Sequence, residues 1–134
     1  MKPVKFTLVL LLLLSWMTVF GQFISEPNNK RKYNEKEAKE EIGKIYDRLI
    51  AGETMEDMAE MISQDPGTYL RGGVLGLVNP VNNYVDSFVL AIEDLKIDEV
   101  SKPFRTDFGY HVAKVLLKKK GKMLIQHILI RVQE

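Results

Sequence analysis

The sequence contains no cysteine, only two histidines and a single tryptophan. Without cysteine no disulfide can form, so a folded domain of this chain must be stabilised by its apolar core. The chain also has no excess of one charge, because 19 lysine and arginine residues stand beside 18 aspartate and glutamate residues. Proteins that bind nucleic acids usually carry a marked basic excess. We therefore expect no nucleic-acid partner.

A long apolar run is also missing, because the apolar block near the N-terminus extends only from Phe6 to Phe20. Spanning a bilayer takes about 20 apolar residues, so the block is short for a membrane anchor, although an uncleaved anchor remains the alternative interpretation. Lys2 and Lys5 provide a basic start. Val19 and Gly21 fit the positions before a secretory cleavage site. These features together are typical of a signal peptide.

Cleavage after this predicted signal peptide, residues 1–21, would leave 113 of the 134 residues, beginning at Gln22. Because Lys2 and Lys5 would be removed, 17 basic residues would face 18 acidic ones, a net charge of −1. That length suffices for one small domain. We expect the mature protein to be periplasmic or secreted, and to contact the membrane only through its signal peptide.

The mature chain shows helical patterns first and strand patterns later. Residues 22–33 are polar and typical of a flexible leader. Apolar residues then recur at helical spacing from Asn34 to Gly52, after Thr54, and from Asn82 to Leu95. Asn34 and Thr54 are suitable N-cap residues, because their side chains can accept hydrogen bonds from free N–H groups.

Four later segments favour strands. The glycine-rich run at 71–78 reads as a brief strand, and the run at 99–106 as an edge strand, because Pro103 cannot donate to a central ladder. The runs at 109–117 and 123–132 are the most strand-like in the chain. Helices followed by a small antiparallel sheet indicate an α+β domain.

Between Glu35 and Leu117, a set of motifs in this order closely resembles the parvulin family of peptidyl-prolyl cis/trans isomerases (rotamases). The motifs lie within the segments SQDPG, RGGVLG, SFVLAIEDL, EVSKP and TDFGYH. The resemblance implies a four-stranded antiparallel sheet surrounded by about four helices, with an isomerase domain at residues 34–120. It also implies an active site of two histidines on central strands, an acidic or thiol side chain, and an apolar proline pocket.

One departure from the family concerns its first strand, which reads roughly HIL and carries the first active-site histidine. The leader at residues 22–33 has no histidine, whereas residues 121–134 contain QHILIRV. A hairpin through the basic turn could bring this segment into the vacant central position. Pairing about Lys119 would place His111 opposite His127, and a shift of two would leave them diagonal on one face. The other interpretation is that residues 121–134 begin a truncated second parvulin module.

The resemblance assigns roles to eight residues of this chain. It implies catalytic roles for Asp65, His111 and, through the C-terminal strand, His127. The implied substrate-binding residues are Leu75, Tyr84 and Phe88 in the proline pocket, with Tyr84 in place of the commoner methionine, and Thr106 and Phe108 beside the loop before His111.

Each role has a structural alternative. Asp65 before Pro66 is a common turn residue, and a histidine within an apolar strand is usually a satisfied core residue. Two histidines could also suggest metal ligation, but without a further histidine or cysteine cluster they make a poor metal set. We expect neither a metal nor another cofactor.

The predicted chemistry breaks no covalent bond. Rotation about a peptide bond crosses a barrier of about 18–20 kcal/mol, and a catalyst must bind the twisted amide better than the planar forms. We predict an exported peptidyl-prolyl isomerase that assists protein folding by acting on proline-containing unfolded or nascent exported polypeptides. The alternative is a non-catalytic parvulin-fold chaperone module that binds unfolded client segments. The two differ in whether both histidines share one site.

Overall fold

The computed structural model describes residues 30–133. The predicted signal peptide at residues 1–21 and most of the predicted leader lie outside these described residues. Within them, no helix combines the length and the apolar character needed to cross a lipid bilayer.

Two helices open the described chain, α2 (Glu35–Ile50) and α3 (Met55–Ile62). The Asn34 side chain accepts a hydrogen bond from the Glu37 N–H at 2.9 Å, and the Glu37 carboxylate accepts one from the Asn34 N–H at 3.0 Å. This reciprocal capping box satisfies two of the N–H groups that a helix leaves unpaired at its start. Thr54 is the N-cap residue of α3, as the sequence predicts.

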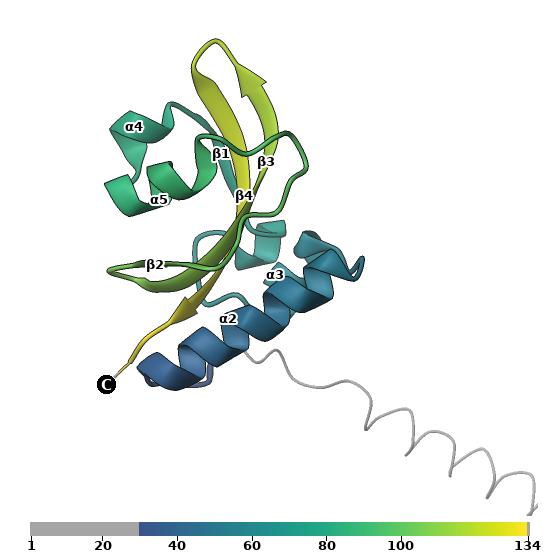
Figure 1. Cartoon of the computed structure of the whole chain (residues 1–134), viewed down its shortest axis with the longest axis vertical. Helices are drawn as coiled ribbons and strands as arrows, with labels where there is room; N and C mark the ends of the chain where they lie inside the picture. Colours follow the sequence, from purple (N-terminus) through teal and green to yellow (C-terminus); the bar gives the residue numbers. More distant parts are fainter. Residues whose placement is uncertain (1–29, 134) are drawn as a thin grey trace, which may run out of the picture.

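Four strands form one antiparallel sheet in the order β1-β4-β3-β2. They are β1 (Val74–Val78), β2 (Phe104–Thr106), β3 (Gly109–Lys119) and β4 (Lys122–Arg131). In Figure 1, β3 and β4 form a long hairpin through the centre, and β4 runs from the turn at the top towards the C-terminus. The α+β class, the four-stranded sheet and the central position of the C-terminal strand are therefore confirmed.

The segment that follows β1 forms two short helices, α4 (Pro80–Asn83) and α5 (Asp86–Ile92). The single helix predicted from Asn82 to Leu95 is wrong, because Tyr84 and Val85 adopt extended backbone angles and separate the two helices. Pro80 starts α4, a position where its fixed φ and missing N–H cost nothing. A 3-10 helix, η2 (Tyr69–Arg71), lies between α3 and β1.

The edge strand β2 is shorter than predicted. Of the run at 99–106, only the last three residues, after Pro103, form β2, while Val100 makes an isolated bridge to Lys114 on β3. β2 is the last strand in the sheet order. No further strand pairs with its outer edge, so the missing N–H of Pro103 leaves no hydrogen bond of the sheet unmade. The predicted edge position is confirmed.

The register of the β3–β4 hairpin differs by two residues from direct pairing of the histidines. His111 faces Leu129, and Ala113 faces His127. Lys120 and Gly121 form the turn with positive φ angles of 50° and 73°. The hairpin is thus centred between these two residues instead of on Lys119, and each β3 residue near the turn pairs with a β4 residue three positions later than pairing about Lys119 would give. A bulge between Val115 and Leu117 reduces this offset to two, so the histidines are diagonal neighbours.

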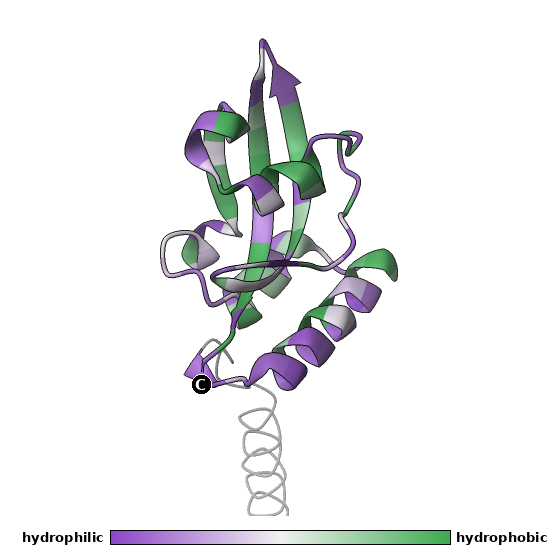
Figure 2. Cartoon of the chain, turned by 60° about the vertical axis from the view of Figure 1, so that its left-hand side comes forward, coloured by the Kyte–Doolittle hydropathy of each residue, from purple (hydrophilic) through white to green (hydrophobic). Residues whose placement is uncertain are grey.

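The two faces of the sheet carry separate apolar clusters. One face packs against α2 and α3, and the other packs against α5 (Figure 2). Alternation along the central strands divides their residues between these faces. On the α2–α3 face lie Val112, Ile128 and Ile130. On the α5 face lie Ala113, Val115 and Ile125, together with Phe88 and Ile92 of α5.

Candidate active site

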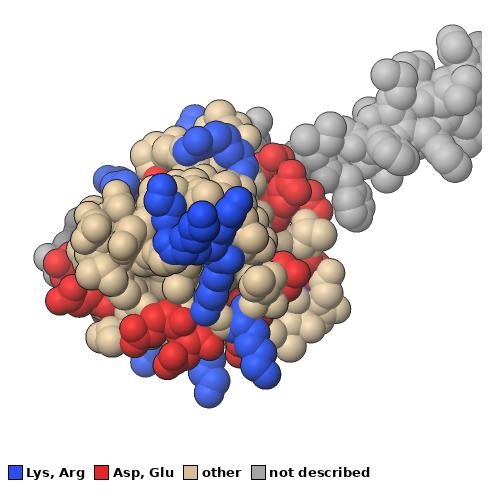
Figure 3. All heavy atoms as spheres, turned by 90° about the horizontal axis from the view of Figure 1, so that it is seen from above, with Lys and Arg blue, Asp and Glu red and all other residues tan. Residues whose placement is uncertain are grey.

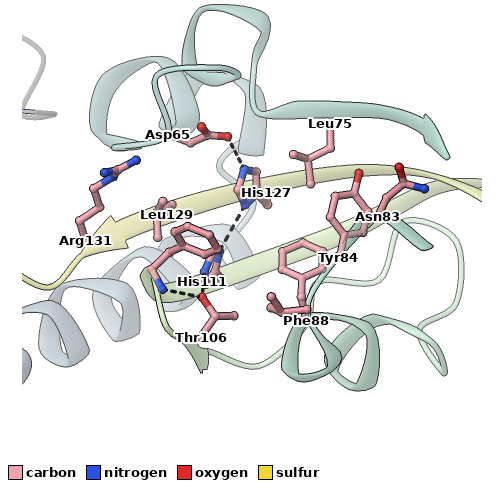
Figure 4. A pocket seen from close by; sticks show the side chains of 12 residues that line it. Asp65, Leu75, Asn83, Tyr84, Phe88, Thr106, His111, His127, Leu129 and Arg131 are labelled. Carbon is pink, nitrogen blue, oxygen red and sulfur yellow. Dashed lines mark hydrogen bonds and ion pairs between the residues drawn. The ribbon is translucent and has the colours of Figure 1, made fainter. Parts of the chain in front are cut away.

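Two imidazoles from neighbouring strands meet on the α5 face of the sheet. His111 on β3 and His127 on β4 place their Nδ1 atoms 3.3 Å apart. Their rings are nearly parallel, with an angle of 20° between the planes and 5.5 Å between the centroids. Their exposed fractions are only 3% and 4%. Figure 4 shows the two side chains pointing towards each other across the hairpin.

A hydrogen-bond chain extends from this pair in both directions. The Nε2 atom of His127 lies 2.8 Å from Oδ2 of Asp65, which follows α3. The Nε2 atom of His111 lies 2.7 Å from Oγ1 of Thr106 at the end of β2. Four side chains, from the segment after α3 and from β2, β3 and β4, therefore form one continuous polar chain, Asp65–His127–His111–Thr106.

The electrostatic surroundings set the charge state of two of these groups. The hydrogen bond from His127 lowers the pKa of the Asp65 carboxyl well below its ordinary value, and those from Thr68 and the Gly67 N–H add to this effect against the opposing effect of burial. Burial lowers the pKa of His111 from 6.5 to about 3, with a further contribution from His127. Near neutral pH, Asp65 is therefore ionised and His111 is neutral.

These charge states determine the direction of the hydrogen bonds when His127 is neutral. The ionised Asp65 can only accept, so Nε2 of His127 donates to it and Nδ1 of His127 is left as an acceptor. The Nδ1–H of His111 then donates to that atom, and Nε2 of His111 accepts from the hydroxyl of Thr106. The Thr106 oxygen in turn accepts from the Phe108 N–H at 3.2 Å. In this charge state of the site, each proton of the chain has one position.

The polar chain forms one wall of a cavity of about 350 Å³. Phe88 of α5 packs edge-to-face against both imidazoles, with its ring centroid 5.6 Å from that of His111 and 5.9 Å from that of His127. Tyr84 packs against Phe88 at 5.0 Å between centroids, and Phe104 does so at 5.4 Å. An apolar aromatic floor therefore adjoins a buried polar wall, and both line a space the size of a small side chain or two.

The structure brings together all eight site residues that the sequence predicts. Each of them lines this cavity: Asp65, Leu75, Tyr84, Phe88, Thr106, Phe108, His111 and His127. Most are buried or half-buried, whereas Phe108 is 58% exposed and lies at the cavity's rim. Their roles in catalysis and binding stay predictions.

Sequence reasoning missed several residues of the same cavity. Leu129 and Arg131 follow His127 at intervals of two and therefore share its face of β4, a periodicity that could have identified them. Asn83 and Val85 flank Tyr84 and also line the cavity. The buried Thr68 hydroxyl donates to Oδ2 of Asp65 at 2.5 Å and lies 3.3 Å from Nε2 of His127.

Backbone contacts hold Asp65 beside β4. The N–H of Gln64 donates to the carbonyl of Leu129 at 2.7 Å, and the hydroxyl of Ser63 accepts from the Leu129 N–H at 3.2 Å. On the other side of the turn, the Gly73 carbonyl accepts from the His127 N–H at 2.9 Å. The segment from α3 to β1 is therefore fastened to β4 on both sides of Asp65, which places its carboxylate beside His127.

Among residues 30–133, no group of three or more histidine, cysteine, aspartate or glutamate side chains is arranged to hold a metal ion. The expectation that the protein works without a metal stays a prediction.

Comparison with known proteins places this geometry in context. Residues 23–116 match the Rotamase family, described as the PPIC-type PPIASE domain. This match ends before β4, which starts at Lys122. The strand that carries His127 therefore lies outside the matched region, in agreement with its unusual place in the chain order.

Two curated relatives show the extent of the similarity. The chain is 43% identical over 83 residues to "Chaperone SurA" of Pseudomonas savastanoi pv. phaseolicola, covering 62% of this chain and 19% of that protein. It is 43% identical over 89 residues to "Foldase protein PrsA" of Geobacillus kaustophilus, covering 66% and 30%. The chain thus spans about a fifth to a third of the length of these relatives.

A solved structure supports the same fold. The peptidylprolyl isomerase PrsA from Bacillus cereus aligns with a TM-score of 0.56 at 36% identity, over 67% of this chain and 33% of that one.

Proposed function

Because the chain belongs to the parvulin family, the PPIC-type peptidyl-prolyl isomerases, we propose that it is an exported prolyl isomerase that assists protein folding. One observation carries the proposal: two buried histidines from β3 and β4, linked to Asp65, face an aromatic cavity. In this proposal Asp65, His111 and His127 form the catalytic network. Leu75, Tyr84, Phe88, Thr106 and Phe108 bind the substrate.

The cavity's chemistry suits the isomerisation of an amide before proline. A planar amide is strongly polar, and it loses much of that polarity when rotation about the C–N bond ends the resonance. Transfer from water into the apolar part of the cavity, beside Phe88 and Tyr84, therefore costs the twisted amide less than the planar one. This difference lowers the barrier, because catalysis requires tighter binding of the transition state than of the ground state.

The polar wall contributes fixed dipoles to the same step. When His127 is neutral, the protons of the Asp65–His127–His111–Thr106 chain have defined positions, so the wall needs no rearrangement as the substrate twists. Because the ionised Asp65 can only accept, it fixes which atoms donate and which accept along the chain of hydrogen bonds. A substitution of one of the four residues therefore alters the hydrogen bonds of the others. The aromatic floor then grips the proline ring while the polar wall faces the rotating carbonyl.

We assign β4 to the same domain as residues 34–120. It pairs with β3 along most of its length and with β1 on its other edge, and it contributes His127 and Leu129 to the cavity. In this assignment residues 121–134 are a permuted central strand. The alternative, the start of a second module, would leave ladder groups of β1 and β3 unpaired.

A second candidate function is a chaperone module that binds unfolded segments without turnover. The rim of the cavity favours it, because Phe108 and Val85 are 58% and 42% exposed and offer apolar surface to an extended chain. The names of the relatives, chaperone and foldase, fit either candidate. In both cases the proposed partners are proline-containing unfolded or nascent exported polypeptides.

Export is part of the proposal and rests on the N-terminal sequence. Lys2, Lys5 and the cleavage pattern at Val19 and Gly21 support a periplasmic or secreted mature protein. Mass spectrometry of the protein from its host should find an N-terminus at or near Gln22. An intact Met1 in a membrane fraction would show that the block is an anchor.

The experiment that tests the proposed activity is an isomerisation measurement. Exchange NMR on a short peptide with one proline should show faster cis/trans interconversion in the presence of the protein. The Asp65→Ala variant should be slower, with a smaller effect on the melting temperature than on the rate. Absence of acceleration by a well-folded wild-type protein, with retained binding of unfolded segments, would favour the chaperone module.

A further inference from the structure

A second cavity lies between α4, α5 and the turn of the β3–β4 hairpin. Its volume is about 280 Å³. Its apolar surface comes from both helices and from β4, and Asn79, Glu93 and Gly121 complete the lining. The apolar lining residues are Pro80, Val81, Val89, Ile92 and Met123. None of the lining residues is shared with the cavity beside the histidines, so the two are separate sites on the same pair of helices.

Lysines lie beside this second cavity at the hairpin turn. Lys118, Lys119, Lys120 and Lys122 are all exposed, and Lys120 and Lys122 flank the lining residue Gly121. Lys118 is the cross-strand partner of Met123, and its Nζ donates to the carbonyl oxygen of Glu93 at 3.0 Å. Met123 and Glu93, two more residues of the lining, are therefore immediate neighbours of Lys118.

These four lysines, which we call the turn lysines, form a concentrated positive surface on a chain with almost balanced charge. Figure 3, which looks at the end of the molecule that carries the hairpin turn, shows a compact group of basic side chains there. The ion pairs found between described residues involve none of the turn lysines. Their charge is thus available to an external partner.

We propose that this second cavity and the turn lysines bind client polypeptide in which an apolar side chain is flanked by acidic residues. A space of about 280 Å³ accepts an apolar side chain, and the neighbouring group of cations at the hairpin turn attracts carboxylates and selects against basic segments. The inference rests on the proposed function, because the occupant is a segment of the client chain.

The position of the site suits an extended chain. Tyr84, which follows α4, and Phe88 of α5 line the isomerase cavity, while Val81 of α4 and Val89 of α5 line the second one. A client whose proline occupies the first cavity can therefore continue along α4 and α5 to the hairpin turn. Holding the client at a second point raises the effective concentration of the proline at the first.

A polypeptide fits this surface better than an anionic membrane does. Residues 119–122 at the tip of the hairpin are lysine or glycine, so the tip presents no apolar side chain for insertion into lipid. Behind the tip, Pro80 and Ile92 are buried and Val89 and Met123 are half-buried, while Val81 is 74% exposed. A flat lipid surface cannot enter such a space, whereas one side chain of an extended peptide can.

The experiment uses the full-length protein and two labelled peptides without proline. Both carry the same central leucine, flanked by aspartates in one peptide and by lysines in the other. Fluorescence anisotropy should show binding of the acidic peptide, weakened by added salt because exposed charges are screened, and at least about tenfold weaker binding of the basic peptide.

Variants at the site change the charge in both directions. Lys120→Glu combined with Lys122→Glu should weaken binding of the acidic peptide about tenfold or more. Glu93→Gln should strengthen it, because Glu93 provides the one carboxylate of the cavity lining. Lys36→Glu combined with Lys39→Glu, on the exposed side of α2, makes the same change in net charge and should leave binding unchanged.

The outcomes separate this inference from the proposed function. The turn-lysine variant should isomerise a short proline peptide at the wild-type rate, since no turn lysine lines the first cavity. Equal binding of the two peptides, or equal loss in the α2 control, would overturn the inference even in an active isomerase. Binding of anionic phospholipid vesicles that depends on the turn lysines, without peptide binding, would overturn it in favour of a membrane surface. Charge-dependent peptide binding by a protein without isomerase activity would support the inference while the proposed function fails.

Discussion

The Nδ1 atoms of His111 and His127 lie 3.3 Å apart, although neither residue is the direct cross-strand partner of the other. The contact is diagonal across the hairpin and depends on the register set by the turn and the bulge. A slip by one residue would send one imidazole to the opposite face of the sheet. The proposed active site is thus a product of one particular pairing of β3 with β4.

The free energy of unfolding should decrease in acid because of His111 and Asp65. The folded pKa of His111 is about 3, against an ordinary value of 6.5. Between these values the unfolded chain binds a proton that the folded chain does not, so the free energy of unfolding falls as pH decreases, by at most about 1.4 kcal/mol per pH unit. Asp65, whose folded pKa is lowered, adds a loss once the pH falls below its ordinary value of 3.8.

Urea unfolding followed by circular dichroism between about pH 7 and pH 4 measures this slope. His111→Gln removes the titrating group and should flatten the dependence above pH 4. An identical slope in the variant would mean that His111 titrates normally in the folded protein.

Phe88 should affect both activity and stability. Its ring is 4% exposed and belongs both to the core cluster on the α5 face and to the cavity floor. Phe88→Ala should lower the free energy of unfolding by about 3–5 kcal/mol and slow isomerisation of a proline peptide. Leu90→Ala is the matched control on α5, because Leu90 is 69% exposed and should change stability by less than about 0.5 kcal/mol. Wild-type turnover in a folded Phe88→Ala protein would remove Phe88 from the site.

Gly73 should tolerate no side chain. Its φ is +81°, and a Cβ atom there would overlap the carbonyl oxygen of His127. Gly73→Ala should therefore destabilise the protein by about 1–3 kcal/mol. It should also disturb His127, because the N–H of His127 donates to the Gly73 carbonyl.

Gly43→Ala is the control, because its Cβ would meet no atom within 4 Å in the middle of α2. That change should stabilise the helix by about 0.5–1 kcal/mol. Thermal melts of the two variants should move in opposite directions.

Local signals in the sequence were sufficient for much of the fold. Asn34 and Thr54 begin helices where their capping side chains predict, since capping depends on residues within one turn. The two most strand-like runs became β3 and β4. The family motifs, together with the HIL sequence of the C-terminal strand, also identified eight residues that the fold brings to one cavity, although they lie as far apart as Asp65 and His127.

Other features depended on contacts that no local pattern records. The break at Tyr84 and Val85 interrupts an otherwise regular helical spacing, because Tyr84 leaves the helix and packs on Phe88. The turn at Lys120 and Gly121 moved the register by three positions and the bulge after Val115 took one back, which leaves the histidines diagonal instead of directly opposite. Thr68 was overlooked because its contact with His127 spans 59 positions in the sequence.

Deletion of residues 123–134 should unfold the domain. The strand is central in the sheet, and its aliphatic side chains are almost fully buried on both faces. Each such side chain contributes about 1.5–3 kcal/mol, whereas whole domains are stable by about 5–15 kcal/mol. The residues concerned include Ile125, Ile128, Leu129 and Ile130. A truncated chain that melts cooperatively near the full-length temperature would show that β4 is dispensable and belongs to another unit.

The most direct test of the account is the rate at which His127→Gln isomerises a short proline peptide. Glutamine keeps a polar side chain in the strand but removes the imidazole that links Asp65 to His111. We expect the melting temperature to change by only a few degrees and kcat/KM to fall on the order of tenfold to hundredfold. A folded variant that isomerises the peptide at the wild-type rate would contradict the claim that the C-terminal strand completes the active site.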